Sequence, residues 1–328
     1  QSGITIYHPR FFSIPVLFRA SDGFFMALGS LLTLYRLKKE FGFNLIDSHF
    51  AFPDGYAATL LGQWFRVPVT ITLRGTEVPL SKITARKAKI LVALKRATRV
   101  FSVSNSLKSH VVSLGAEAEK VRVVGNGVDL EKFNPIDRRE ARKQLKIPVD
   151  VKVLISVGGL VERKGFHRVI EVLPELIKIH SKLLFLIVGG ESPEGNIRNQ
   201  LEKQVEQLGL QDNVRFLGAM PSNELKKPLS AADIFVLATA NEGWANVFLE
   251  AMGCGLPVIT TEVGGNREVI CRDELGTVIP FGERERLKNA LLKALEKKWD
   301  NKAILSYAAD NSWDSRVEVL VEEFESLV

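Results

Sequence analysis

The chain has 328 residues, of which 46% are hydrophobic and 25% are charged, and its formal net charge is +6. This composition is that of a folded protein and excludes a disordered or low-complexity chain. The length exceeds the roughly 250 to 300 residues at which a single core stops growing, so two domains are expected.

The cysteine count excludes a disulfide-stapled protein, and the hydropathy excludes a membrane-spanning protein. Cys254 and Cys271 are too few for a disulfide framework and are not spaced as metal ligands, so we expect two buried thiols in a cytoplasmic protein. The longest uncharged stretch near the start runs from Gly23 to Tyr35. It is shorter than the roughly 18 residues of a membrane span, and no signal-peptide pattern precedes it.

The first part of the chain alternates short apolar runs with amphipathic segments. The runs "NLIDSHF", "VTITL", "VFSVS" and "VRVVGNGV" are separated by predicted helices over 55–66, over 82–99 and from 106 onward. Continuous apolar runs of this length between helices are typical of parallel strands that are covered on both faces. A Rossmann-like domain is therefore expected over residues 1–135.

Positive charge is concentrated in this first domain. It has 18 Lys and Arg against 9 Asp and Glu up to Pro135, whereas the remainder has 26 against 29. Seven basic residues between Lys82 and Arg99 have no acidic neighbour between them, which indicates an anionic partner. No nucleic-acid-binding motif accompanies them, so we expect an anionic membrane surface or a lipid-linked acceptor and no nucleic acid; a merely solvated helix face is the alternative. In this helix we expect core positions at Ile83, Ile90, Leu91 and Leu94 and outward positions at Lys82, Arg86, Lys89 and Arg96.

The second part of the chain repeats the rhythm more regularly. After the turn-rich segment "NGVDLEKFNP", a plausible hinge, come the apolar runs "KVLISVGGL", "LLFLIVGG", "NVRFLGA", "IFVLAT", "PVITT" and "GTVIP", with helical segments between most of them. Such alternation predicts a doubly wound parallel sheet. This second Rossmann-like domain is expected over residues 136–311.

Ligands of such sheets lie beyond the carboxyl ends of the strands, where glycine turns and helix N-termini approach anions. The loop "SVGGLVERKG" follows a strand and supplies two glycines, Gly158 and Gly159, and two cations, Arg163 and Lys164. We interpret it as a phosphate-binding turn. A solvated turn before a helix is the alternative.

The stretch "NEGWANVFLEAMGCG" places two glutamates around the start of a helix. We expect Glu242 to end a strand, Gly243 to make the turn and Asn246 to act as the N-cap. Because helical side chains lean toward the N-terminus, Glu250 in the second turn would border the same pocket as Glu242. In the alternative, Glu250 only interacts with its own helix dipole and Glu242 faces solvent.

The ordered set of motifs resembles glycosyltransferase family 4, whose members are retaining sugar-nucleotide transferases with the GT-B fold. The motifs are "SHFAFPDGYAA", "NGVDLEKFNP", "VGGLVERKG", "RFLGAM", "ADIFVLAT", "EGWANVFLEAMGCGLPVITTEVGGNREVI" and the terminal "NSWDSRVEVLVEEF". The resemblance implies two Rossmann-like α/β domains that face each other across a cleft. It also implies that the last helix, residues 312–328, crosses back onto the first domain through a stripe at Trp313, Val317, Leu320, Val321 and Phe324.

The resemblance also implies roles for individual residues. Glu250 would hold the ribose hydroxyls, and Glu242 would face the transferred sugar. Lys164 with Arg163 would meet the diphosphate. The implied donor site consists of Gly159, Arg163, Lys164, Gly218, Ala219, Glu242, Gly243, Trp244, Ala245, Asn246, Val247 and Glu250, in which Gly218 and Ala219 frame the base. The implied catalytic residues are Glu242, His49 and Lys164, and the acceptor side is expected at His49 and Arg74.

The sequence departs from the family pattern at three places. Gly159 stands where many members have an arginine, so Arg163 is expected to supply the second cation. Arg74 in "TLRGTEV" stands where a histidine is common. The glycine-rich first loop of the amino-terminal domain is not found in this sequence, so we expect that domain to be incomplete.

The implied activity is transfer of a hexosyl group from a nucleotide sugar, of the UDP or GDP type, to a hydroxyl acceptor in polysaccharide or glycolipid synthesis. Retention of anomeric configuration, no cofactor, no metal and peripheral binding at the inner face of the membrane are expected with it. A hinged nucleotide-sugar binding protein, or an inactive fragment without turnover, is the alternative. An NAD oxidoreductase is excluded because no Gly-x-Gly-x-x-Gly follows a first strand.

Overall fold

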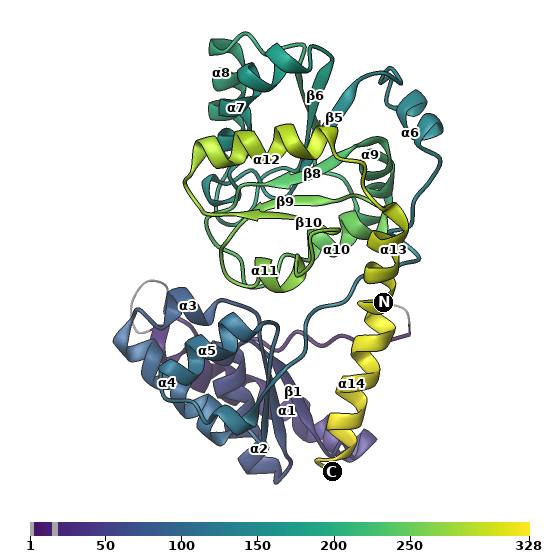
Figure 1. The fold of residues 1–328 in the computed structure, drawn as a ribbon. Coiled ribbons are helices and arrows are strands. Elements are labelled where there is room, and N and C mark those ends of the chain that lie inside the picture. Colours follow the sequence, from purple (N-terminus) through teal and green to yellow (C-terminus); the bar gives the residue numbers. More distant parts are fainter. Residues whose placement is uncertain (1–2, 15–18) are drawn as a thin grey trace. The chain divides into compact units, whose positions relative to one another are not determined.

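The computed structural model describes residues 3–14 and 19–328, and the chain divides into two compact units (Figure 1). Unit 1 comprises the chain up to Gly125 together with Val317–Val328, and unit 2 comprises Asn126–Arg316. Parts of the domain expected over 1–135, residues 1–2 and 15–18, lie outside the described residues.

The boundaries differ from the expected ones because the linking segments pack into unit 2. Val128 and Phe133 are buried in the core of that unit. Val128 also pairs with the segment before the last helix: its N–H donates to the Asn311 carbonyl at 3.0 Å, and its carbonyl accepts from the Trp313 N–H at 3.0 Å. Unit 2 therefore begins at residue 126 rather than 136, and it ends at residue 316 rather than 311.

Unit 1 is a parallel four-stranded sheet with strand order β1-β2-β3-β4. Its strands are β1 (Ile46–His49), β2 (Val69–Leu73), β3 (Arg99–Ser102) and β4 (Val121–Val123). Its helices are α1 (Asp22–Phe41), α2 (Tyr56–Phe65), α3 (Glu77–Leu80), α4 (Thr84–Arg96) and α5 (Asn105–Ser113), with shorter turns η1 (Arg19–Ser21), η2 (Ala51–Gly55) and η3 (Ala118–Lys120). All five residues of β2 are buried, as expected of a central strand.

The basic segment forms α4, which packs on the unit by Ile90 and Leu94. Ile83, expected in the core, is 46% exposed because it precedes the first turn of the helix. Lys89, expected to point outward, instead leans over Tyr56 and donates from Nζ to its hydroxyl at 3.2 Å. Lys82, Lys95 and Arg96 are exposed.

The last helix, α14 (Trp313–Glu325), contributes the residues from Val317 onward to unit 1. Phe324 packs edge-on against Phe101, with ring centroids 5.8 Å apart. Glu323, the one buried residue of this helix, forms an ion pair with Arg99, Oε2 to Nε at 3.0 Å, and another with Arg122. The apolar stripe expected on this helix is therefore wrong at Val317 and Val321, which are exposed. Arg99 of β3 and Arg122 of β4 pair with the Glu323 carboxylate, so this residue is buried in place of the expected valines.

Unit 2 is a parallel six-stranded sheet with strand order β10-β9-β8-β5-β6-β7. Its strands are β5 (Lys152–Val157), β6 (Leu183–Val188), β7 (Val214–Gly218), β8 (Ile234–Leu237), β9 (Val258–Thr261) and β10 (Gly276–Ile279). Its helices are α6 (Arg138–Gln144), α7 (Phe166–Ile179), α8 (Arg198–Gln207), α9 (Lys226–Ala231), α10 (Asn246–Gly253), α11 (Asn266–Val269), α12 (Arg284–Glu296) and α13 (Asn301–Asp310), with turns η4 (Glu162–Lys164) and η5 (Ser222–Glu224).

Alternate residues of the central strands enter two separate hydrophobic cores. In β5, Val153 and Ile155 pack with α9, α10 and α13, whereas Leu154 packs with α7, α8 and α12. In β8, Phe235 joins the first core and Val236 the second. Both faces of the sheet are thus covered, which explains why these strands are continuous apolar runs without polar alternation.

The strand order reverses direction between β5 and β8. From β5 the chain adds β6 and β7 on one side, and from β8 it adds β9 and β10 on the other. Loops leaving such a neighbouring pair diverge to opposite faces, and the space between them is where open α/β sheets bind ligands. The doubly wound sheet expected from the sequence is confirmed, and this switch point locates its candidate site.

Two sequence expectations of a general kind can also be compared with the fold. Cys254 is buried, but Cys271 is exposed, so the expectation of two buried thiols is wrong for one of them. Across residues 3–14 and 19–328, no helix combines the length and the apolar character needed to cross a bilayer.

Candidate functional site

Two loops meet at the switch point of unit 2. The β5 loop, residues 158–165, follows β5, and the β8 loop, residues 238–245, follows β8. The Ala240 N–H donates to the Arg163 carbonyl at 2.7 Å. Gly165 has a φ of +76°, and a Cβ added to it would lie 1.9 Å from the Ala238 carbonyl oxygen, so glycine is required there. The two loops are therefore fixed against each other by backbone contacts.

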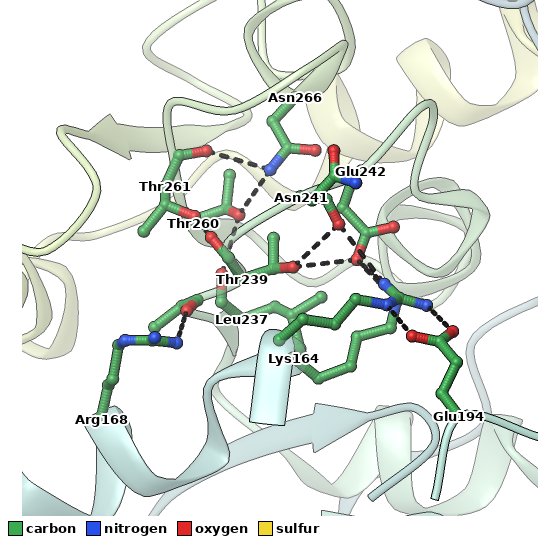
Figure 2. A network of polar contacts seen from close by, with 12 residues as sticks. Lys164, Arg168, Glu194, Leu237, Thr239, Asn241, Glu242, Thr260, Thr261 and Asn266 are labelled. Carbon is green, nitrogen blue, oxygen red and sulfur yellow. Dashed lines mark hydrogen bonds and ion pairs between the residues drawn. The ribbon is translucent and has the colours of Figure 1, made fainter. Parts of the chain in front are cut away.

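A buried carboxylate joins the side chains of both loops. Oε1 of Glu242 accepts from Lys164 Nζ at 2.6 Å, from Thr239 Oγ1 at 3.1 Å and from Arg163 Nη1 at 3.4 Å. The side chains of Glu242 and Lys164 are 9% and 14% exposed. Figure 2 shows Lys164 and Glu242 directed toward each other. Because an unpaired buried charge is costly, each of these groups depends on the other for its place.

Arg163 has a second carboxylate partner, which the sequence analysis missed. Its Nε and Nη2 donate to the two carboxylate oxygens of Glu194 at 2.5 and 2.6 Å. The hydrogen bond to Glu194 is the main cause that raises the pKa of Arg163, and the same bond lowers the pKa of Glu194. Glu194 lies in the loop between β6 and α8. The signal that could have found it is its position after the strand next to β5, at the same edge of the sheet.

The segment from the end of β9 to the start of α11, residues 260–266, supports the β8 loop from the other side. The Asn266 side chain is fully buried, and its Nδ2 donates to Thr260 Oγ1 at 3.2 Å and to the Thr261 carbonyl at 3.0 Å (Figure 2). Thr261 Oγ1 donates in turn to the Thr239 carbonyl at 2.5 Å. Gly264 has a φ of +51°, and a Cβ there would lie 1.6 Å from the Glu242 carbonyl oxygen. The position of Glu242 thus depends on the segments that follow three neighbouring strands of the sheet, β5, β8 and β9.

Glu250 lies on α10, in its second turn as expected. Within the described residues its carboxyl makes no hydrogen bond or ion pair, with Glu242 or with any other group. Burial raises the pKa of Glu250 to about 7. The indole Nε1 of Trp244 is likewise buried without a hydrogen-bond partner among the residues described. A carboxyl and an indole N–H of this kind are groups that a polar ligand would satisfy.

Two local expectations for this stretch are wrong. β8 ends at Leu237, so Glu242 lies in the loop rather than at the end of the strand. Asn246 is the first residue of α10 and Ala245 holds the N-cap position, because the Asn246 side chain is turned to accept from Asn126 Nδ2 at 2.7 Å.

The glycines at the ends of β6 and β7 approach each other closely. Gly218, which closes β7 with a φ of +77°, accepts from the Gly189 N–H at 2.9 Å. A Cβ on Gly190 would lie 3.1 Å from the Ala219 Cβ, and one on Gly159 would lie 3.0 Å from the Ser192 Cβ. The positions expected to frame a base therefore lie at the carboxyl edge of the sheet. Gly218 is the last residue of β7, and Ala219 follows it.

The two residues expected on the acceptor side meet within unit 1. His49 ends β1 and Arg74 follows β2, and Arg74 Nε donates to His49 Nδ1 at 2.9 Å. This bond assigns the ring proton of neutral His49 to Nε2, which lies 3.5 Å from Asp47 Oδ2. Desolvation, and then the Arg74 cation, lowers the pKa of His49. The pair therefore favours a neutral imidazole.

A cavity of about 200 Å³ lies between α7 and α12. It is lined by Arg168, Glu171 and Arg284 and also by Ala238 of the β8 loop and Thr261 at the end of β9. The sequence analysis had selected none of these residues. Among the described residues, no group of three or more His, Cys, Asp and Glu side chains is arranged to hold a metal ion.

The raised pKa of Glu250 predicts a pH-dependent effect of Glu250→Gln on stability. Between pH 4.5 and about 7 the native state keeps a proton that the unfolded state releases, so wild-type stability falls as pH rises through this window. Glutamine carries no such cost. Relative to wild type, the variant should gain about 2 to 3 kcal/mol in free energy of unfolding between pH 5 and pH 8. Urea unfolding at both pH values measures this, and an equal difference at the two would contradict it.

Comparison with known proteins extends the account of the site. The model of the family Glycosyl transferases group 1 matches residues 137–311, more than half of the chain, and the model of Glycosyltransferase Family 4 matches residues 6–132. The chain is 34% identical over 228 residues to a D-inositol 3-phosphate glycosyltransferase of Corynebacterium urealyticum, covering 66% of this chain and 54% of that protein. The match thus spans about half the length of that relative. A Bacillus subtilis protein whose name assigns it to teichuronic acid biosynthesis is 27% identical over 323 residues, covering 97% of this chain and 74% of that one.

The fold is also similar to that of a solved structure. The structure of HepE from Anabaena in complex with UDP is 22% identical and has a TM-score of 0.80, covering 90% of this chain and 82% of that chain. The likeness shows that the two α/β units are those of the GT-B fold. The two family matches show that the chain belongs to the glycosyl transferases group 1 family.

Proposed function

We propose that this protein is a retaining glycosyltransferase, which moves a hexosyl group from a nucleoside diphosphate sugar to a hydroxyl acceptor in polysaccharide or glycolipid synthesis. The observation that carries the proposal is the group of Lys164, Arg163 and Glu242 at the switch point of the unit 2 sheet. Family membership supports the reaction type. The names of relatives that act in glycoconjugate synthesis, and the UDP held by HepE, support the donor class.

In this proposal the cations of the β5 loop hold the diphosphate. Lys164 is fixed by its bond to Glu242, and Arg163 presents a planar fork that suits phosphate oxygens. The first amides of α10 add the positive end of a helix dipole. Together they would stabilise the charge that grows on the leaving diphosphate, which is the largest electrostatic demand of the reaction. The proposal includes no metal ion.

The two glutamates would act on different parts of the donor. Glu250 is largely buried, has no hydrogen-bond partner among the described residues, and would accept hydrogen bonds from the ribose hydroxyls. Glu242 would face the transferred sugar together with the amides of Gly243 to Val247. A carboxylate beside the anomeric carbon can both position it and stabilise the positive charge that develops there.

The transfer is proposed to be a front-side displacement. The acceptor hydroxyl would attack the anomeric carbon on the face from which the diphosphate departs, so the configuration is kept. The leaving phosphate would take the hydroxyl proton, and no covalent enzyme nucleophile is assigned. His49, neutral and oriented by Arg74, is proposed to bind the acceptor.

A thermal-shift panel tests the donor class on the 328-residue chain. The ligands are UDP, GDP, ADP and a sugar ester of each. We expect one base series to stabilise the chain, by about 2.7 kcal/mol at 100 times its Kd. The stabilising sugar ester should then be consumed when an alcohol acceptor is added. Binding without consumption would favour a hinged binding protein, and no stabilisation by any ligand would overturn the proposal.

Glu242→Ala and Glu250→Ala should differ in kind in steady-state kinetics with the donor that this panel identifies. Ribose hydroxyls are held alike in the ground and transition states, so Glu250→Ala should chiefly raise donor KM, by roughly ten- to a hundredfold. Glu242→Ala should chiefly lower kcat. Glu274→Ala, which alters an exposed surface carboxylate, is the control. Unfolding curves must show all three variants folded, and wild-type kcat and KM in both site variants would refute the division of roles.

We also propose that the basic segment from Lys82 to Arg99 binds an anionic membrane surface or a lipid-linked acceptor. The exposed cations Lys82, Lys95 and Arg96 are accompanied by the exposed apolar side chains of Ile83 and Val92. Cations near an anionic surface and apolar groups at its boundary are the two contributions to peripheral binding.

Changing Lys82, Lys95 and Arg96 to glutamine should abolish most liposome binding. Each cation contributes roughly 1 kcal/mol near an anionic surface, so the partition coefficient should fall by about a hundredfold. The matched control changes three exposed lysines of unit 2, Lys203, Lys298 and Lys302, to glutamine. Sedimentation with phosphatidylserine-containing and neutral vesicles at low salt measures both. Equal sedimentation of the wild type with the two vesicle types would contradict the proposal.

A further inference from the structure

The loop between β6 and α8, residues 190–197, holds its glutamate at a defined place. The Gly190 carbonyl accepts from the Leu160 N–H at 2.8 Å, and the Ile197 N–H donates to the Leu160 carbonyl at 2.7 Å. Between these anchors, Ser192 and Gly195 exchange two backbone hydrogen bonds, at 3.1 and 2.9 Å. The Glu194 N–H donates to Ser192 Oγ at 3.2 Å. Both ends of the loop are thus fastened to the β5 loop that carries Arg163.

Gly159 fits this arrangement. A Cβ at residue 159 would lie 3.0 Å from Ser192 Cβ, which is closer than side chains normally pack. A long cationic side chain at 159 would meet the turn that presents Glu194. Glycine at 159 therefore leaves room for the turn that presents Glu194, and the cation that Glu194 contacts is Arg163.

The bond between Glu194 and Arg163 has the geometry of an anion bound by arginine. Two parallel N–H groups meet two oxygens at 2.5 and 2.6 Å, as they would in a bidentate phosphate complex. The Glu194 side chain is 52% exposed, whereas that of Glu242 on Lys164 is 9% exposed. The first carboxylate can exchange with a solute, and the second is part of the packed structure.

We propose that Glu194 is an internal competitor for the diphosphate at Arg163. It is bound to the guanidinium in this structure and must give it up when a diphosphate binds. The consequence is weaker binding of donor and product alike, and hence easier release of the nucleoside diphosphate after transfer. This inference rests on the proposed function, because it needs a diphosphate at Arg163.

The test compares Glu194→Gln with Glu191→Gln, which removes the same charge from an exposed position of the same loop. Calorimetric titration of the full chain with UDP, GDP and ADP, and with uridine, guanosine and adenosine, separates the phosphate from the base. For the diphosphate that binds, the Kd of Glu194→Gln should be roughly two- to fivefold lower than that of wild type. The nucleoside Kd should not change. The gain should also shrink between low and high salt, because the competition is between exposed charges.

Three outcomes overturn the inference while leaving the proposed function intact. The diphosphate Kd is unchanged in Glu194→Gln, or it rises, which would make Glu194 a part of the binding site. The third is an equal gain in Glu191→Gln, which would reduce the effect to general electrostatics. If the wild type and both variants bind none of the three diphosphates, both the proposed function and this inference fail.

Discussion

The arrangement of unit 2 depends on the close approach of the β5 loop to the end of β8. Gly165 lies so close to the Ala238 carbonyl that no side chain fits between them, and Ala240 is bonded to the Arg163 backbone. Loops that leave neighbouring strands toward opposite faces would otherwise separate. Their contact places Lys164 beside Glu242, and everything proposed for the donor site follows from that pair.

A buried ion pair is a costly way to join two loops, and that cost is informative. Removing Lys164 and Glu242 from water costs several kcal/mol, which their attraction offsets only because the geometry is good and Thr239 supplies a further hydrogen bond. An apolar pair would serve stability as well. The proposed donor would account for charge at this place, and also for the Glu250 carboxyl and the Trp244 indole, which have no hydrogen-bond partner among the described residues.

The sequence predicts this fold well where the signal is local and less well where contacts between distant segments decide. The apolar runs locate the ten strands of the described residues. Four of these strands, β2, β6, β8 and β9, are buried along their whole length and so have no polar alternation to obscure them. The last helix was expected to turn an apolar stripe inward, yet Glu323 is its buried residue, because Arg99 and Arg122 come from strands about two hundred positions earlier. Ile83 was placed in the core because hydropathy does not show where a helix begins. Cys271 was expected to be buried because it is neither in a disulfide framework nor spaced as a metal ligand, yet it is exposed.

The candidate site divides in the same way. Lys164, Arg163 and Glu242 could be selected from glycine-flanked loops after strands, and the structure brings them together. Glu194 was missed, because its role depends on the pairing of β5 with β6, and its position after β6 was the one sequence signal that pointed to it. The sequence analysis missed Asn266 for a related reason. A buried asparagine that supports a neighbouring loop has no local sequence pattern that marks it.

The central claim is that unit 2 binds a nucleoside diphosphate between the β5 and β8 loops. Hydrogen exchange of the backbone amides, measured with and without the diphosphate that stabilises the chain, tests this directly. We expect slower exchange over residues 158–165 and 238–250, and unchanged exchange over residues 281–287, a segment that contributes Gly282, Glu283, Arg284 and Leu287 to the cavity between α7 and α12. Protection confined to 281–287, or to unit 1, would contradict the account.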